Sequence, residues 1–178
     1  MLDYTKQATR TESLDLFKVD NARILHAAIG ASTEVSELVL AEPGDITNVK
    51  EEMGDILWYI AIAADALGLN RIEDFLPLAD KARVDLDAIK AMVGSAADAL
   101  DVVKRGLFYG IELDEVKFGG HFGTLLDAVQ ILAKDSGWTL TDLKVANIGK
   151  LSKRYPEKFT SEKAVNRDTV AEMEAVGA

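Results

Sequence analysis

A chain of 178 residues, 48% of them apolar, is long enough to form one domain with a substantial core. It has no cysteine, which excludes disulfides and thiolate metal sites, and its formal net charge of −10 argues against sequence-independent binding of nucleic acid. No signal peptide is evident, and the apolar stretch 56–69 contains Asp65 and is too short to span a bilayer. We therefore expect a soluble, cytoplasmic protein.

The first half of the chain predicts two helices joined by a tight turn. Between about 14 and 42, apolar residues recur at helical spacing and form one stripe: Ile24, Ala28, Ala31, Val35, Leu38 and Val39. Pro43 and Gly44 end this segment, and Asp45 is expected to cap a second helix that runs to about Leu67. We expect this helix to end at Gly68.

The second half continues the helical pattern. A long helix is expected from about 77 to 108, with a break near Gly94, and the glycine-containing stretch 118–123 is expected to precede a helix through Leu132. A further helix should begin near Thr141 and end before Pro156, and the polar residues from about 160 to 178 predict a loosely packed tail. Because no alternating strand pattern stands out, the prediction is a single all-α domain over 1–178, with its helical core at about 14–156.

Four acidic residues flank the Pro-Gly turn in two matched pairs: Glu34, Glu37, Glu52 and Asp55. Each pair lies on one flank of its apolar stripe, so antiparallel packing across the turn would line all four along one groove. Carboxylates that converge raise one another's pKa, and a hard divalent cation such as Mg²⁺ relieves this repulsion. Glu51 lies about 100° around the helix from this flank and is not counted among the ligands. On the pattern alone, a solvated acidic face remains an alternative.

The spacing E-x-x-E, fourteen residues, E-x-x-D resembles the signature of the all-α NTP pyrophosphatases, the MazG-like superfamily. EEMGDILWYIAIAADALGL (51–69) is similar to the second motif helix of that family, and NIGKLSKRYPEKF (147–159) to its C-terminal pattern. DALDVVKRGLFYG (98–110) resembles the third core helix of some members. The resemblance covers about 21–160 and implies a four- to five-helix bundle core that assembles as a dimer or a dimer of dimers.

Members of this family cleave nucleoside triphosphates between the α and β phosphates, releasing a monophosphate and pyrophosphate. Carried over to this chain, the resemblance implies that Glu34, Glu37, Glu52 and Asp55 hold Mg²⁺, for which Mn²⁺ could substitute. Glu34 or Glu37 could instead act catalytically by taking the proton from the attacking water. The implied partners are a nucleoside triphosphate, with a deoxynucleotide favoured, and further copies of the chain, without nucleic acid or membrane. The base and the sugar are left open.

Basic residues gather near the C-terminus, where 144–167 holds seven basic and two acidic residues. Asn147, Lys150 and Arg154 share one helix face and could reach the same phosphates. A solvated basic helix that balances an acidic body would explain the same pattern.

Four charged residues share one face of the helix expected from about 77 to 108: Asp98, Asp101, Lys104 and Arg105. Lys104 could contact phosphate, while Asp98 or Asp101 could add a metal ligand or hold that lysine in place. Surface ion pairs explain this pattern equally well. Contacts with the base are expected around Asn21 and Ile24, whereas Trp58 and Tyr59 are expected to pack in a core or a subunit interface.

Other classes fit less well. A di-iron carboxylate bundle needs Glu-x-x-His, and neither His26 nor His121 has a glutamate three residues before it. The Nudix motif, the Walker loop and the G-x-S-x-G elbow are all absent. The alternative that stays open is a non-catalytic helical oligomerisation or regulatory module that keeps the fold.

Overall fold

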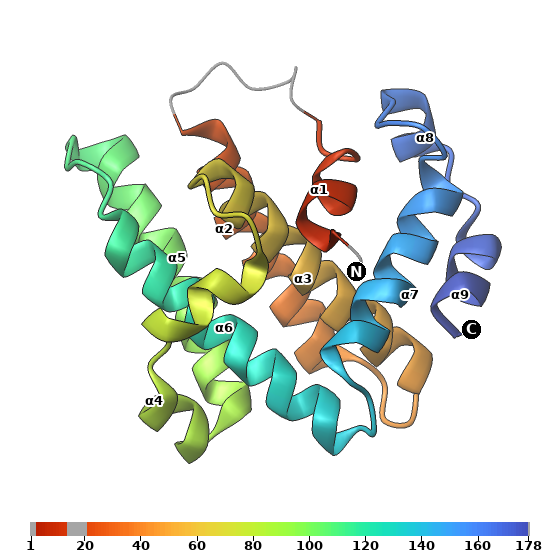
Figure 1. The fold of residues 1–178 in the computed structure, drawn as a ribbon, viewed down its shortest axis with the longest axis horizontal. Coiled ribbons are helices and arrows are strands. Elements are labelled where there is room, and N and C mark those ends of the chain that lie inside the picture. Colours follow the sequence, from red (N-terminus) through yellow and green to blue (C-terminus); the bar gives the residue numbers. More distant parts are fainter. Residues whose placement is uncertain (1–2, 14–20, 178) are drawn as a thin grey trace.

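The computed structural model describes residues 3–13 and 21–177, and within these ranges the regular secondary structure is all helical, with no strand (Figure 1). This confirms the all-α prediction. None of the described helices is long and apolar enough to cross a membrane. The elements are α1 (Tyr4–Thr9), α2 (Ala22–Leu40), α3 (Ile46–Ala66), the 3-10 helix η1 (Ile72–Leu78), α4 (Lys81–Leu86), α5 (Ala88–Tyr109), α6 (Glu115–Asp135), α7 (Leu140–Arg154), α8 (Ser161–Val165) and α9 (Thr169–Gly177).

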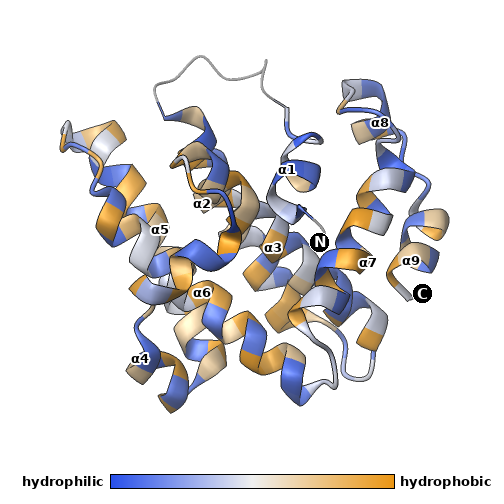
Figure 2. Cartoon of the chain, viewed as in Figure 1, coloured by the Kyte–Doolittle hydropathy of each residue, from blue (hydrophilic) through white to orange (hydrophobic). Residues whose placement is uncertain are grey.

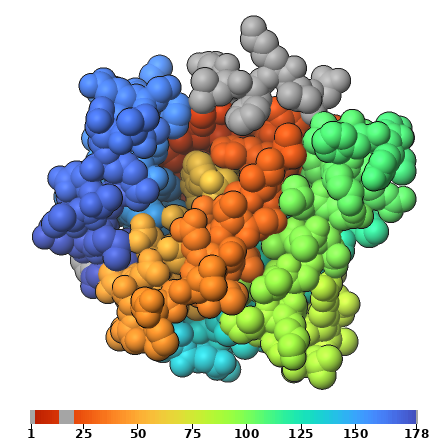
Figure 3. Space-filling view, turned by 180° about the vertical axis from the view of Figure 1, so that it is seen from behind, coloured from red at the N-terminus to blue at the C-terminus, as the bar shows by residue number. Residues whose placement is uncertain are grey.

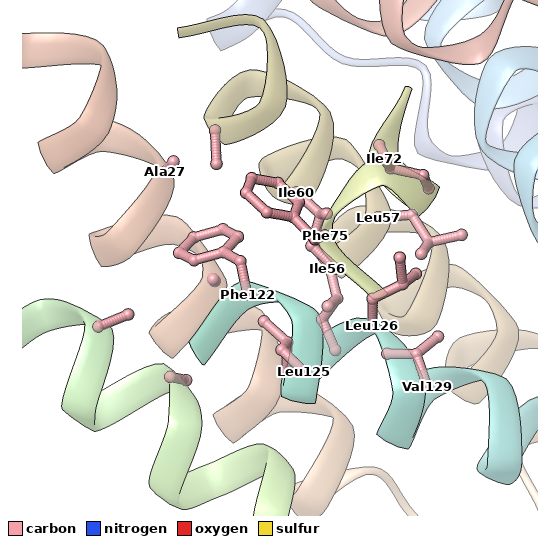
Figure 4. Packing of buried hydrophobic residues seen from close by; sticks show 14 of the residues in the cluster. Ala27, Ile56, Leu57, Ile60, Ile72, Phe75, Phe122, Leu125, Leu126 and Val129 are labelled. Carbon is pink, nitrogen blue, oxygen red and sulfur yellow. The ribbon is translucent and has the colours of Figure 1, made fainter. Parts of the chain in front are cut away.

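Helix α3 is the central element, because it packs against α1, α2, η1, α6, α7 and α9. Its residues Ile56, Leu57 and Ile60 are fully buried, and Figure 4 shows them among side chains from α6 and η1, including Phe122 and Phe75. Apolar and hydrophilic residues alternate along the long helices in Figure 2, the pattern expected of helices that bury one face. The core is therefore built from inward stripes that helical periodicity already indicates.

The α2–α3 hairpin forms as predicted. The Asp45 carboxylate accepts a hydrogen bond from the backbone N–H of Asn48 at 3.0 Å and caps α3. At the other end Gly68 has φ +71°, a left-handed conformation that favours glycine after a helix. The predicted start of the first helix near 14 lies outside the described residues, and α2 is described from Ala22.

The predicted break near Gly94 lies instead at Asp87. The Asp87 carboxylate accepts a hydrogen bond from the N–H of Lys90 at 3.0 Å, so it caps α5 and separates it from α4. Gly94 lies within α5, where an added Cβ would stand 1.9 Å from Nη2 of Arg83. The glycine therefore makes room for a side chain of α4 and does not end the helix.

The glycines of 118–123 lie inside α6, although the sequence predicted that they precede a helix. They mark the place where η1 crosses: a Cβ on Gly123 would stand 2.4 Å from the carbonyl oxygen of Phe75, and one on Gly119 3.1 Å from Leu78. Close approach of two backbones favours glycine even in a helix, which otherwise disfavours it.

The second half of the C-terminal segment, α9, is packed, which corrects the predicted loose tail there, whereas α8 buries no residue. Helix α9 lies beside α7 and also contacts α3 (Figure 1). Val176 is 1% exposed, and Lys50 Nζ donates a hydrogen bond to the Val176 carbonyl at 2.7 Å. The polar Glu172 can be buried in this segment because Arg154 and Arg167 both pair with it.

Candidate active site

A cavity of about 420 Å³ lies between the α2–α3 hairpin, the turn after α1 and the C-terminal end of α7. Figure 3 shows this face hollowed between the red and orange N-terminal helices and the blue C-terminal segment. The volume is typical of small-molecule sites. The lining residues are Thr11, Ser13, His26, Glu34, Glu37, Glu51, Glu52, Asp55, Trp58, Tyr59, Leu151, Arg154, Tyr155, Phe159 and Arg167.

One wall of the cavity is acidic and contains all four predicted metal ligands. Glu34 and Glu37 from α2 and Glu52 from α3 each bring a carboxylate oxygen within 4.8 Å of the other two. Burial and the charges of Asp55 and Glu37 raise the pKa of Glu34 to about 7. Burial and the charges of Asp55 and Glu34 raise that of Glu52 to about 8. A hard divalent cation among these oxygens would relieve the repulsion, so the three residues fit such an ion.

Asp55 differs from the other three acids because it already has a cation. Lys150 Nζ donates hydrogen bonds to Asp55 and, at 2.9 Å, to Oε1 of Glu51, and the Lys150 side chain is 1% exposed. Asn147 Nδ2 donates to Asp55 at 3.0 Å, and the Tyr4 hydroxyl donates to Asn147 Oδ1 at 2.8 Å.

This arrangement alters three expectations from the sequence. Asn147 and Lys150 were expected to reach phosphates, but they lie behind the acidic wall and hold Asp55 in place. Glu51 was left out of the site, yet it lines the cavity as the second partner of Lys150. The cause is the burial of α7 against α3, which leaves the lysine no path to the cavity surface.

The wall formed by the C-terminal segment is cationic. Arg154, at the end of α7, and Arg167, between α8 and α9, both line the cavity. Each donates two hydrogen bonds to the Glu172 carboxylate, at 3.0 and 2.5 Å from Arg154 and at 3.2 and 2.7 Å from Arg167. Although burial opposes it, these bonds lower the pKa of Glu172 to about 2. Arg154 is the one predicted phosphate-binding residue that lines the cavity.

Aromatic side chains complete the cavity. His26, Trp58 and Tyr59 contact one another edge to face, with ring centroids 4.7 to 5.8 Å apart. Trp58 Nε1 donates to the Ala8 carbonyl at 3.0 Å and to Thr11 Oγ1 at 3.1 Å, which fixes the indole against the segment after α1. Trp58 and Tyr59 do contact the core, as expected, but they also form part of the cavity wall.

The remaining predicted site residues lie elsewhere in the single chain. Lys104 pairs with Asp101 on the exposed face of α5, and Asp98 pairs with Arg83 of α4 at 2.9 Å. Asn21 lines a separate cavity beside the α5–α6 connection, and Ile24 is 4% exposed in the core.

Sequence reasoning missed His26, Arg167, Glu172 and the residues after α1 as parts of one site. Arg167 belongs to the basic segment 144–167, so local charge gives a signal for it. Glu172 and Thr11 give none, because Arg154 and Trp58, to which they are hydrogen-bonded, lie 18 and 47 residues away in the sequence.

Acidic, cationic and aromatic walls around one cavity can bind a multiply charged anion that carries an aromatic ring, together with a divalent cation. Comparison with models of protein families, with curated proteins and with solved structures gave no match. The resemblance to the MazG-like superfamily therefore stays a prediction, and the function is argued from this cavity.

Proposed function

We propose that the chain is a Mg²⁺-dependent nucleoside triphosphate pyrophosphohydrolase of the MazG-like type, active as a homo-oligomer. It would cleave the bond between the α and β phosphates and release a monophosphate and pyrophosphate. The observation that carries the proposal is the convergence of Glu34, Glu37 and Glu52 in a cavity that also holds two arginines and an aromatic wall. The motif spacing of the acids supports the same chemistry.

Each wall has a part in the proposed reaction. Glu34, Glu37 and Glu52, with Asp55 beside them, would hold Mg²⁺. Bound there, the ion would neutralise phosphate charge and lower the pKa of a coordinated water. One of the two α2 acids, Glu34 or Glu37, would instead leave the ion to the other acids and take the proton of the attacking water, since both line the cavity.

The other walls orient the substrate. Arg154 and Arg167 provide planar guanidinium groups that bind phosphate oxygens in pairs. His26, Trp58 and Tyr59 offer ring faces and edges to the nucleobase. Binding the phosphate chain at the cationic wall and the base at the aromatic wall would hold the α phosphate near the acidic cluster.

The test is Mg²⁺-dependent turnover of all eight common NTPs and dNTPs, with the products resolved chromatographically. Monophosphate plus pyrophosphate is the expected pair, and Mn²⁺ is expected to support turnover as well. Glu52→Gln should lose activity by about 100-fold or more, as expected when a metal site is disrupted. Glu42→Gln is the matched control, because Glu42 is an exposed acid near the same turn and does not line the cavity.

Two results would contradict the proposal. Diphosphate plus phosphate as products would place the cleavage at a different bond. Absence of turnover on every nucleotide, together with no thermal stabilisation by Mg²⁺, would favour the non-catalytic helical module.

A further inference from the structure

Glu172 does not line the cavity, yet it holds both of the arginines that do. Its side chain is 1% exposed, and it accepts four hydrogen bonds, two from Arg154 and two from Arg167. Hydrogen bonds between guanidinium and carboxylate groups are strong and strongly directional. The cationic wall therefore takes its position from a residue of α9.

The acids of the cavity compete with Glu172 for these arginines. Nη2 of Arg167 lies 2.7 Å from Glu172 and 3.9 Å from Oε1 of Glu51, so this guanidinium already stands between two carboxylates. Arg154 experiences the charge of Asp55 as well as that of Glu172. An arginine released by Glu172 would face several carboxylates across a cavity of about 420 Å³ and would move toward them.

We propose that Glu172 is a positioning residue that keeps Arg154 and Arg167 away from the acidic cluster of Glu34, Glu37 and Glu52. The acids then stay available to a divalent cation, and the arginines stay available to the phosphate chain of the substrate. This inference rests on the proposed function, since it concerns the same cavity. It makes the C-terminal segment a functional part of the site.

If Glu172 served only to dock α9, a carboxylate would not be needed at this position. Helix α9 has a separate anchor, because Val176 is buried and its carbonyl accepts a hydrogen bond from Lys50 at 2.7 Å. An apolar residue at 172 would dock the helix without the desolvation cost of a buried carboxylate. Both partners of this carboxylate are cavity residues, which points to a role in the cavity.

The experiment compares Glu172→Gln with the unmodified protein and measures binding, so that it does not depend on turnover. Mn²⁺ affinity is measured by electron paramagnetic resonance, and affinity for inorganic tripolyphosphate by calorimetry. We expect Mn²⁺ binding to weaken by about tenfold, the scale seen when residues that support a metal site are removed. Tripolyphosphate binding should weaken too, and Glu172→Asp, which keeps the charge, should bind both probes better than Glu172→Gln.

Lys50→Met provides the matched control. It removes the second anchor of α9 and is expected to lower the thermal midpoint while leaving Mn²⁺ affinity unchanged. Equal weakening in Lys50→Met and Glu172→Gln would assign the effect to helix docking and overturn the inference. If Glu172→Gln does not fold, Glu172→Asp is compared with Lys50→Met in its place, by the same criterion.

The two proposals fail in different ways. Unchanged Mn²⁺ and tripolyphosphate affinity in a folded Glu172→Gln overturns the positioning role, while Mg²⁺-dependent turnover of the unmodified protein would leave the proposed function standing. No Mn²⁺ binding by the unmodified protein would refute both, since the arginines would then have no metal site to obstruct.

Discussion

Lys150 is the cation that compensates the charges of Asp55 and Glu51 behind the acidic wall of the cavity. Its side chain is 1% exposed, and its ammonium group donates to Asp55 and Glu51. Burial disfavours the charged form, but the two carboxylates more than offset this and raise the pKa of Lys150 above its usual value. Substitution by methionine keeps the length and the apolar packing of the side chain and removes the charge.

The expected loss of stability is large. Removing one partner of a buried ion pair costs about 3–5 kcal/mol, because the other partner is left charged and without compensation. Natural domains have about 5–15 kcal/mol of net stability in total. For a chain of this size, each kcal/mol shifts the midpoint by about 2–4 °C, so Lys150→Met should unfold about 6–20 °C below the unmodified protein.

The assay is thermal unfolding followed by circular dichroism without metal, with Lys104→Met as the control. Lys104 also pairs with an aspartate, Asp101, but at the surface, so its loss should leave the midpoint nearly unchanged. An uncompensated Asp55 binds a proton more readily in the folded variant than in the unfolded chain. The deficit of Lys150→Met should therefore narrow as the pH falls. Equal midpoints for the two variants would refute the reasoning.

Two further predictions concern the acids and the helix crossing. Because the pKa of Glu34 is raised to about 7 and that of Glu52 to about 8, their contribution to the free energy of unfolding falls as pH rises toward about 8 in metal-free protein. Glu52→Gln should therefore raise the thermal midpoint in EDTA more at about pH 8 than at about pH 5, and equal shifts would count against this. Gly123→Ala would place a carbon 2.4 Å from the Phe75 carbonyl oxygen and should destabilise the fold. The cost expected for such overpacking is about 1–3 kcal/mol by urea unfolding. Gly120→Ala, whose added carbon would lie 3.4 Å from its nearest atom, should be neutral or stabilising; equal losses would contradict the crossing argument.

The parts of the fold that sequence predicts well are those set by local rules. The α2–α3 hairpin follows from two apolar stripes, a Pro-Gly turn and an Asp45 cap, and it is the hairpin that brings Glu34 and Glu37 near Glu52. Helical spacing fixes the flank that each acid occupies, so this convergence needs no further information about the fold.

Glycine was misread wherever its role depends on a distant partner. Gly94 and Gly123 resemble helix breakers in the sequence, but each lies inside a helix at a place where a side chain or backbone of another element passes close by. In the sequence, a glycine that ends a helix looks the same as a glycine that makes room for a neighbouring element. Only the positions of Arg83 and Phe75 distinguish the two cases.

Lys150 and Arg154 show why the roles of the candidate site's cations could be predicted only in part. Lys150 and Arg154 share a helix face, as predicted, but α3 buries the first while the second reaches the cavity. Residues of the same charge on the same face therefore have different roles, one holding Asp55 and one available to a ligand. Spacing along a helix gives the direction of a side chain, whereas the neighbouring helix decides whether it meets solvent.

The distribution of charge gives the strongest physical reason to expect a metal ion. The cations nearest the cavity are already paired with other acids: Lys150 pairs with Asp55 and Glu51, and Arg154 and Arg167 share Glu172. Within 3–13 and 21–177, no lysine or arginine forms an ion pair with Glu34, Glu37 or Glu52, although their oxygens lie within 4.8 Å of one another. A protein that needed only stability would neutralise these acids with one of the cations already nearby. We propose that Glu172 instead holds the two arginines apart from these acids, and that a divalent ion from solution is the partner of the three carboxylates.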